Sequence, residues 1–147
     1  MSGAAEGFFI AGSIPPILAG GAHGLHALRD AFRPRAFAPI DRSVQPVMAG
    51  TGIRLRRWFG GDGAEPSVWR VWLGVHMTHG LGIFTFGLLC LLIALQDYAL
   101  VERIDVLRPM AIAFSAALLA ICLRFFFYGP VIVATTSTVC FTLAAVL

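Results

Sequence analysis

The chain contains no lysine, and all eleven of its basic residues are arginines. Charged residues of either sign are scarce, at 13% of 147 residues, whereas a soluble domain carries roughly 25%. Hydrophobic residues make up 58% of the chain. This shortage of charge excludes an ordinary water-soluble domain and indicates a protein embedded in a lipid bilayer.

A complete catalytic or disulfide pattern is also missing. The cysteines Cys90, Cys122 and Cys140 are odd in number and far apart, which excludes a disulfide framework and predicts buried thiols. No Ser-His-Asp or Cys-His set falls in one place, and His76-Met-Thr-His79 lacks the glutamate of a zinc-protease helix. We therefore predict no catalytic residues.

Four long apolar runs predict an all-α fold, a transmembrane four-helix bundle that forms one domain over residues 1–147. About 20 apolar residues cross the hydrocarbon core as a helix. Pro15 and Pro16 should kink the first helix, because neither has an amide hydrogen to donate. The predicted spans are residues 7–28, 68–95, 110–127 and 131–147.

Eight of the eleven arginines lie between residues 29 and 70, most of them in the long connection 29–67. Because basic residues favour the cytoplasmic side, we expect this connection in the cytoplasm and both termini on the periplasmic or exterior side of a bacterial inner membrane. The local charge favours anionic lipid headgroups as partners and argues against nucleic acid. The residues expected at the membrane interface are Trp69, Arg70, Trp72, Arg124 and Tyr128.

The connection 29–67 has the pattern of a cuff on the membrane surface rather than of a catalytic domain. Asp41 is expected to cap a short helix that carries Val44, Val47 and Met48. Residues 53–59 mix arginine with apolar side chains, as membrane-surface segments do. The glycines of residues 60–63 predict a flexible break and lack the features of a phosphate loop.

The four histidines of the chain form two pairs inside apolar runs, His23-x-x-His26 and His76-x-x-His79. Residues three apart share one face of a helix, and antiparallel first and second spans would bring the two pairs to a similar depth. A histidine inside a membrane is costly and usually faces a partner within the protein. The histidines are therefore the candidate site.

Three interpretations of the histidines stay open: they bond across the helices, they handle protons, or they bind haem b or a transition metal. In the third interpretation His23 and His79 are the preferred pair, and His26 and His76 are further candidate metal ligands. Asp30 would orient His26. A haem also needs a slot, and the small residues expected to leave one are Gly20, Gly24 and Gly80.

Two short motifs, Trp69-Arg-Val-Trp-Leu-Gly74 and His79-Gly-Leu-Gly82, resemble a family of small four-helix bacterial inner-membrane proteins without an assigned activity. The resemblance extends to the Asp30–Arg35 and Phe125–Val131 segments. His26 and His76 fit the family pattern less well, so the resemblance implies a two-histidine site rather than a four-histidine site. The matching positions are Trp69, Trp72, Gly74, His79 and Gly82, together with His23.

Three functions follow as hypotheses. The leading one is a non-enzymatic accessory or structural membrane protein, bound to another membrane protein or to a second copy of itself, because the helix faces are rich in glycine and no active site is complete. The second is a haem or metal protein that transfers electrons through His23 and His79. The third is a small transporter, which the absence of carboxylates within the predicted spans disfavours.

Overall fold

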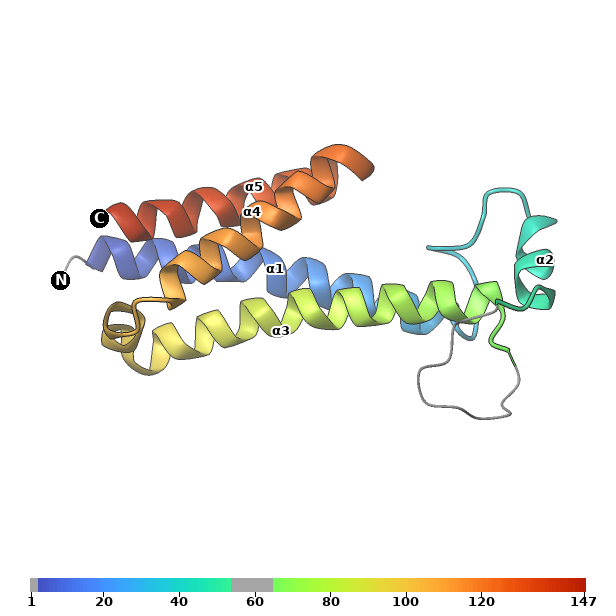
Figure 1. The fold of residues 1–147 in the computed structure, drawn as a ribbon, viewed down its shortest axis with the longest axis horizontal. Helices are drawn as coiled ribbons and strands as arrows, with labels where there is room; N and C mark the ends of the chain where they lie inside the picture. The colour runs from blue at the N-terminus through green and yellow to red at the C-terminus, as the bar shows by residue number, and fades with distance from the viewer. Residues whose placement is uncertain (1–2, 54–64) are drawn as a thin grey trace. The chain divides into compact units, whose positions relative to one another are not determined.

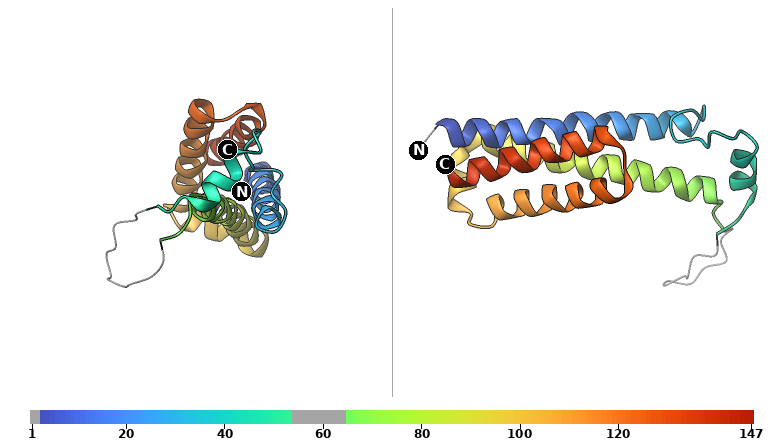
Figure 2. Two further views of the ribbon diagram at one scale, coloured as in Figure 1. Left: turned by 90° about the vertical axis from the view of Figure 1, so that its right-hand side faces the viewer. Right: turned by 90° about the horizontal axis from the view of Figure 1, so that it is seen from above.

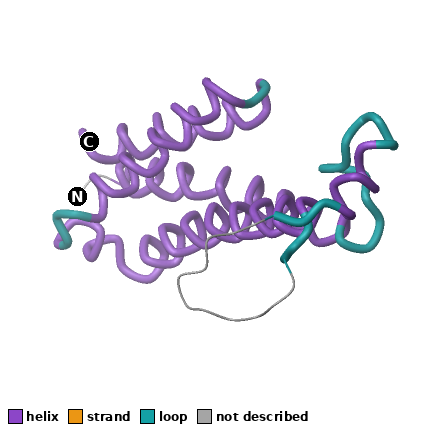
Figure 3. The backbone as a smooth tube through the Cα atoms, turned by 45° about the vertical axis from the view of Figure 1, so that its right-hand side comes forward, coloured by secondary structure: helices purple, strands orange, loops and turns teal. Residues whose placement is uncertain are grey.

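A computed structural model describes residues 3–53 and 65–147, and helices account for most of them (Figure 3). In this part of the chain the one extended pairing is an isolated antiparallel bridge between Gly52 and Ser67. The predicted all-α class is confirmed. The helices are α1 (Gly3–Asp30), α2 (Val44–Gly50), α3 (Val68–Arg103), α4 (Leu107–Phe125) and α5 (Tyr128–Val146) (Figure 1).

Four of these helices, all except α2, are long and apolar enough to cross a membrane. They have 28, 36, 19 and 19 residues, and about 20 residues suffice to span the hydrocarbon core. Each also exposes large apolar side chains, among them Leu18, Leu81, Leu123 and Ile132. Lipid solvates such a surface and water does not, so these features are those of a multi-pass membrane protein.

The helix bounds correct the predicted spans. α1 extends to Asp30, and α3 continues past residue 95 to Arg103. α4 begins before Pro109 and α5 begins before Pro130, although each proline was expected to precede its helix. Proline fits the first turn of a helix because its missing amide hydrogen is not needed there.

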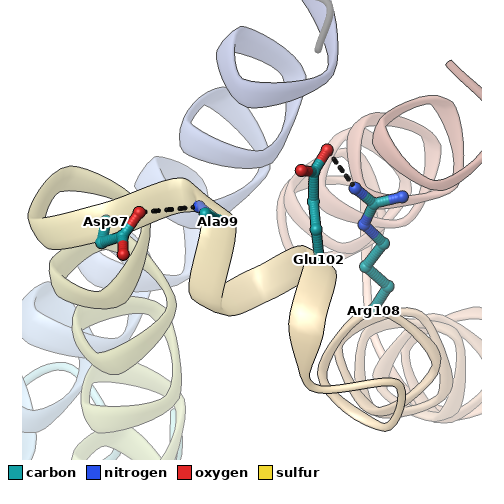
Figure 4. Close-up of polar contacts among 4 residues, drawn as sticks. All are labelled: Asp97, Ala99, Glu102 and Arg108. Atoms are coloured by element: carbon teal, nitrogen blue, oxygen red, sulfur yellow. Dashed lines mark hydrogen bonds and ion pairs between the residues drawn. The ribbon is translucent and has the colours of Figure 1, made fainter.

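The end of α3 contains a break that the sequence did not predict. Asp97 has non-helical geometry, with φ −164° and ψ 100°, and its Oδ1 accepts the Ala99 N–H at 3.0 Å (Figure 4). An aspartate in this place caps the helical segment that follows it. α1 is continuously helical through Pro15 and Pro16, and the kink predicted there stays a prediction.

The chain forms two compact units. The first comprises the chain up to Gly21 together with Leu81–Leu147, and the second comprises Ala22–Gly80. In the first unit the parts of α1 and α3 lie with α4 and α5, and these four helices alternate in direction (Figures 1 and 2). The start of α1 and the end of α5 therefore lie at the same end of this unit.

Aromatic rings and small residues pack the core of the first unit. Phe9 contacts Phe141 and Tyr98, with ring centroids 5.1 and 6.0 Å apart. A Cβ atom at Gly87 would lie 2.8 Å from the Ser13 carbonyl oxygen, so α1 and α3 approach too closely there for any side chain. The three cysteines are free and of intermediate exposure, whereas the sequence predicted buried thiols.

The second unit contains the end of α1, the start of α3 and the connection between them. The predicted surface segment beyond Ile53 and the predicted glycine break fall within residues 54–64, which lie outside the described residues. On either side of them, the Ile53 N–H donates to the Pro66 carbonyl and the Val68 N–H to the Thr51 carbonyl, both at 2.9 Å. These bonds fix the ends of the described connection against each other.

Helix α2 is the short helix predicted in this connection, but its cap differs from the prediction. Ser43 occupies the N-cap position. The Asp41 carboxylate accepts the Ser43 N–H at 2.9 Å and the Ser43 hydroxyl at 2.8 Å, which lowers the pKa of Asp41. Asp41 thus orders the turn before α2 instead of capping the helix itself.

Candidate functional site

Two of the four histidines contact each other directly within the second unit. His23 from α1 and His76 from α3 are half-buried, and His23 Nε2 lies 3.1 Å from His76 Nδ1. A hydrogen bond of this kind needs one nitrogen that carries a proton and one that does not. The two rings therefore form a polar contact between α1 and α3, and each predicted histidine pair contributes one member to it.

The remaining histidines take different places. The His79 ring is half-buried and lies edge-on to His23, with ring centroids 5.2 Å apart. His26 is exposed. Across residues 3–53 and 65–147, no set of three or more His, Cys, Asp or Glu side chains is placed to hold one metal ion. The structure thus gathers three histidines and leaves His26 at the surface.

Two glycines of the predicted haem slot face each other beside the histidines. A Cβ atom on Gly24 would lie 3.9 Å from the Gly80 carbonyl carbon and 4.0 Å from its Cα. This is the spacing of an ordinary van der Waals contact. The backbones of α1 and α3 approach closely here, as small residues allow in membrane helices. Gly20, the third glycine of the predicted slot, belongs to the first unit.

Phe37, which the sequence analysis did not single out, covers the histidine pair. Its ring stacks on His76 with centroids 4.1 Å apart and lies 4.7 Å from the His23 ring. The Trp72 indole N–H donates to the Phe37 carbonyl at 3.1 Å, and the Trp72 ring meets His76 edge-on at 4.5 Å. Aromatic rings from the connection and from α3 therefore close over the pair.

Asp30 holds Phe37 in this position. Asp30 is 2% exposed, and its carboxylate accepts the Ala36 N–H at 3.1 Å and the Phe37 N–H at 2.7 Å. Hydrogen bonds to a carboxylate are stronger than those between neutral groups. Both Asp30 oxygens are thus used by the backbone of the connection, whereas the sequence suggested His26 as the partner. We call residues 31–43, which begin directly after Asp30, the strap.

The residues predicted at the membrane interface differ in exposure. Trp69 is buried, whereas Arg70 and Trp72 are exposed. At the end of α4 the Arg124 guanidinium lies 5.3 Å from the centroid of the exposed Phe125 ring, and Tyr128 is exposed. Trp69 therefore packs within the second unit. The other four residues are exposed, as contact with the predicted membrane interface requires.

A second polar cluster lies in the first unit, near the connection between α3 and α4. Arg108 Nη2 lies 3.0 Å from Glu102 Oε1 (Figure 4), and the guanidinium lies 5.7 Å from the Tyr98 ring centroid. The Tyr98 hydroxyl and Arg108 Nε are buried without a partner among the described residues. A cavity of about 280 Å³ adjoins Glu102, Asp105 and Arg108. No sequence signal marks this cluster, because its members lie at helix ends without a motif.

Comparisons with protein-family models, with curated proteins and with solved structures found no match for this chain. The family resemblance at Trp69–Gly74 and His79–Gly82 accordingly stays a prediction.

Proposed function

We propose that this chain is a non-enzymatic accessory protein of a bacterial inner membrane, which acts in complex with another membrane protein or with a second copy of itself. The observation that carries the proposal is the use of the candidate site. His23 and His76 bond to each other beside the Gly24–Gly80 contact, and Phe37 covers them. In an enzyme, histidines of this kind would face a substrate. In this chain they join two helices instead.

The apolar helix surfaces support the same proposal. Glycine and small residues on α1 and α3 permit close helix contacts, and Gly74 and Gly82 of α3 have no atom within 4 Å of an added Cβ. These two positions leave backbone accessible to a further helix. Membrane helices associate through such small-residue surfaces because backbone contact and packing, not water exclusion, favour association in lipid.

The experiment that tests this proposal is extraction of the tagged chain into polymer-bounded native nanodiscs, followed by mass measurement and identification of co-purified proteins. We expect a complex of defined stoichiometry. Gly74→Leu and Gly82→Leu should reduce it, whereas Gly7→Leu, another open glycine, should leave it unchanged. A solitary monomer that saturably transports or converts a substrate would contradict the proposal.

One observation favours a second candidate function, the binding of a transition metal. Two imidazole nitrogens on one tetrahedral Zn²⁺, each about 2.0–2.1 Å from the metal, lie roughly 3.3 Å apart. The 3.1 Å between His23 Nε2 and His76 Nδ1 is close to that separation, and His76 Nε2 is buried without a partner among the described residues. A metal site would therefore use His23 with His76, and His79 would be the nearest further ligand.

Absorption spectra of the oxidised and reduced protein, with metal analysis of the same sample, test this second candidate. Bound metal should be lost in His23→Ala and His76→Ala and kept in His26→Ala, whose wild-type side chain is exposed. The haem hypothesis for His23 and His79 predicts instead a Soret band that His79→Ala removes. A colourless, metal-free preparation would contradict both the metal hypothesis and the haem hypothesis and leave the accessory function.

A further inference from the structure

We propose that the strap, residues 31–43, docks on the headgroups of anionic phospholipids and anchors its exposed apolar side chains in the membrane surface. This inference goes beyond the accessory function, since it assigns the strap a ligand of its own. It depends on the charge, exposure and hydrogen bonding of residues that the structure describes. It does not involve residues 54–64.

The positive charge of the strap is not neutralised within the described protein. Arg33, Arg35 and Arg42 are exposed, and no ion pair joins any of them to another described residue. The one acid of the strap, Asp41, binds Ser43, and the adjoining Asp30 binds the Ala36 and Phe37 amides. Both nearby carboxylates are therefore occupied, and three guanidinium groups remain for an external anion.

Apolar side chains alternate with these arginines. Phe32 is 82% exposed and Ile40 is 104% exposed, and Val44 and Val47 of the adjoining α2 are exposed as well. Large apolar groups in water are unfavourable. A surface that combines basic and apolar residues is typical of segments that lie in the headgroup region of a bilayer. A soluble polyanion would satisfy the arginines and leave Phe32 and Ile40 in water.

The strap is connected to two candidate spans, which places it near the headgroups of a bilayer. It begins directly after α1 and leads through α2 toward α3, and both long helices are candidate spans. Chain between two spans returns to the same face of the bilayer, so the lipid headgroups lie within reach of the strap. Each arginine near an anionic surface strengthens association roughly fivefold. Phe37, latched to His76 and Trp72, keeps the strap folded while it docks.

The test is limited trypsin cleavage of the full chain in lipid nanodiscs, read by mass spectrometry at the Arg35–Ala36 and Arg42–Ser43 bonds. In nanodiscs with about one third phosphatidylglycerol, cleavage should be at least roughly tenfold slower than in pure phosphatidylcholine. About 0.5 M NaCl should remove this protection, because salt screens exposed charges. The Arg103–Ile104 bond at the end of α3, also exposed, is the internal control and should show no protection.

Variants separate lipid docking from folding. Ile40→Ser and Phe32→Ser change exposed side chains and keep every cleavage site, and each should lose most of the protection. Phe125→Ser, at an exposed phenylalanine outside the strap, should keep it. Helical circular dichroism and elution volume must match the wild type in all three variants.

Three outcomes would overturn the inference. The first is equal cleavage of both strap bonds in neutral and anionic nanodiscs. The second is equal protection in neutral nanodiscs by inorganic phosphate or a soluble polyphosphate, which would identify a soluble anion as the ligand. The third is protection in neutral nanodiscs that grows with protein concentration, which would identify a second copy of the chain.

Discussion

At the scale of single residues, the contribution of a polar side chain between membrane helices to stability depends on its hydrogen-bond partner. His23 and His76 are half-buried and bond each other at 3.1 Å. Removing one ring leaves a nitrogen of the other without its partner, which costs about 1–3 kcal/mol for buried groups. Measured couplings between polar residues in membrane helices are smaller, about 0.6 kcal/mol on average and at most about 1.7 kcal/mol.

We therefore predict that His23→Ala and His76→Ala each lower the free energy of unfolding by about 1–2 kcal/mol. The double variant should be only slightly less stable than either single variant, because the second change removes a bond that is already lost. His26→Ala, at an exposed residue, should stay within about 0.5 kcal/mol of wild type. Unfolding titrations in mild detergent measure all four, and strictly additive losses would contradict the pairing.

The sequence predicted part of this site for a physical reason. The i, i+3 spacing places each histidine pair on one helical face, so a meeting of the pairs was predictable. The choice of His76 over His79 as the partner of His23 was not, because it depends on the rotation of α3 about its axis. Phe37 was hidden for another reason: it comes from a connection, where no periodicity marks the residues that fold inward.

At the scale of elements, the packing of α1 on α3 depends on Gly87, which differs from another glycine of α3 in how closely it is packed. A Cβ at Gly87 would meet the Ser13 carbonyl oxygen at 2.8 Å and the Ile17 amide nitrogen at 3.0 Å. These are backbone atoms that cannot rotate away. Gly82, on the same helix and part of the family resemblance, has open space where its Cβ would be.

Gly87→Ala should accordingly destabilise the protein by about 1–3 kcal/mol, the usual cost of overpacking. Gly82→Ala should be neutral or stabilising by up to about 1 kcal/mol, because alanine favours the helix more than glycine does. Thermal unfolding in one detergent compares the two substitutions directly. Equal effects would show that helix propensity, and not the contact with α1, controls both positions.

The strap is an element whose order depends on a buried carboxylate. Asp30→Asn keeps the size of the side chain but replaces one acceptor oxygen by an amide group that cannot accept the second backbone N–H. We expect hydrogen exchange at the Ala36 and Phe37 amides to speed up by roughly tenfold or more. Asp41→Asn is the matched control, since Asp41 bonds Ser43 instead, and should leave those two amides unchanged. Unaltered exchange in Asp30→Asn would show that the Asp30 carboxylate does not order the strap.

The existence of the helices was predictable and their ends were not. Long apolar runs without charge determine a membrane helix almost by themselves, so the four candidate spans agree with the prediction. The ends depend on local hydrogen bonds that hydropathy does not register. Asp97 breaks α3 through its bond to the Ala99 amide, and Pro109 and Pro130 sit inside first turns.

At the scale of the whole molecule, charge and span number act together on orientation. If all four candidate helices span the bilayer, the chain returns to the side from which it started, and we expect the two termini in the same compartment. The arginines between residues 29 and 70 are then expected on the opposite side, and basic connections favour the cytoplasm. Arg124, at the end of α4, is separated from that connection by two candidate spans, so the same topology predicts it on the same side as the connection.

Reporter fusions on the two sides of the membrane test this topology. A phosphatase that is active only in the periplasm should be active when fused after Leu147 and inactive when inserted after Gly50, and a fluorescent protein that matures only in the cytoplasm should give the reverse result. Replacing Arg29, Arg33, Arg35 and Arg42 by glutamine should weaken the orientation, because basic residues near the ends of spans carry the signal. Replacing Arg103 and Arg108, at the connection between α3 and α4, should preserve or strengthen it. A cytoplasmic C-terminus in the unaltered protein would contradict both the topology and the placement of the strap on the cytoplasmic leaflet.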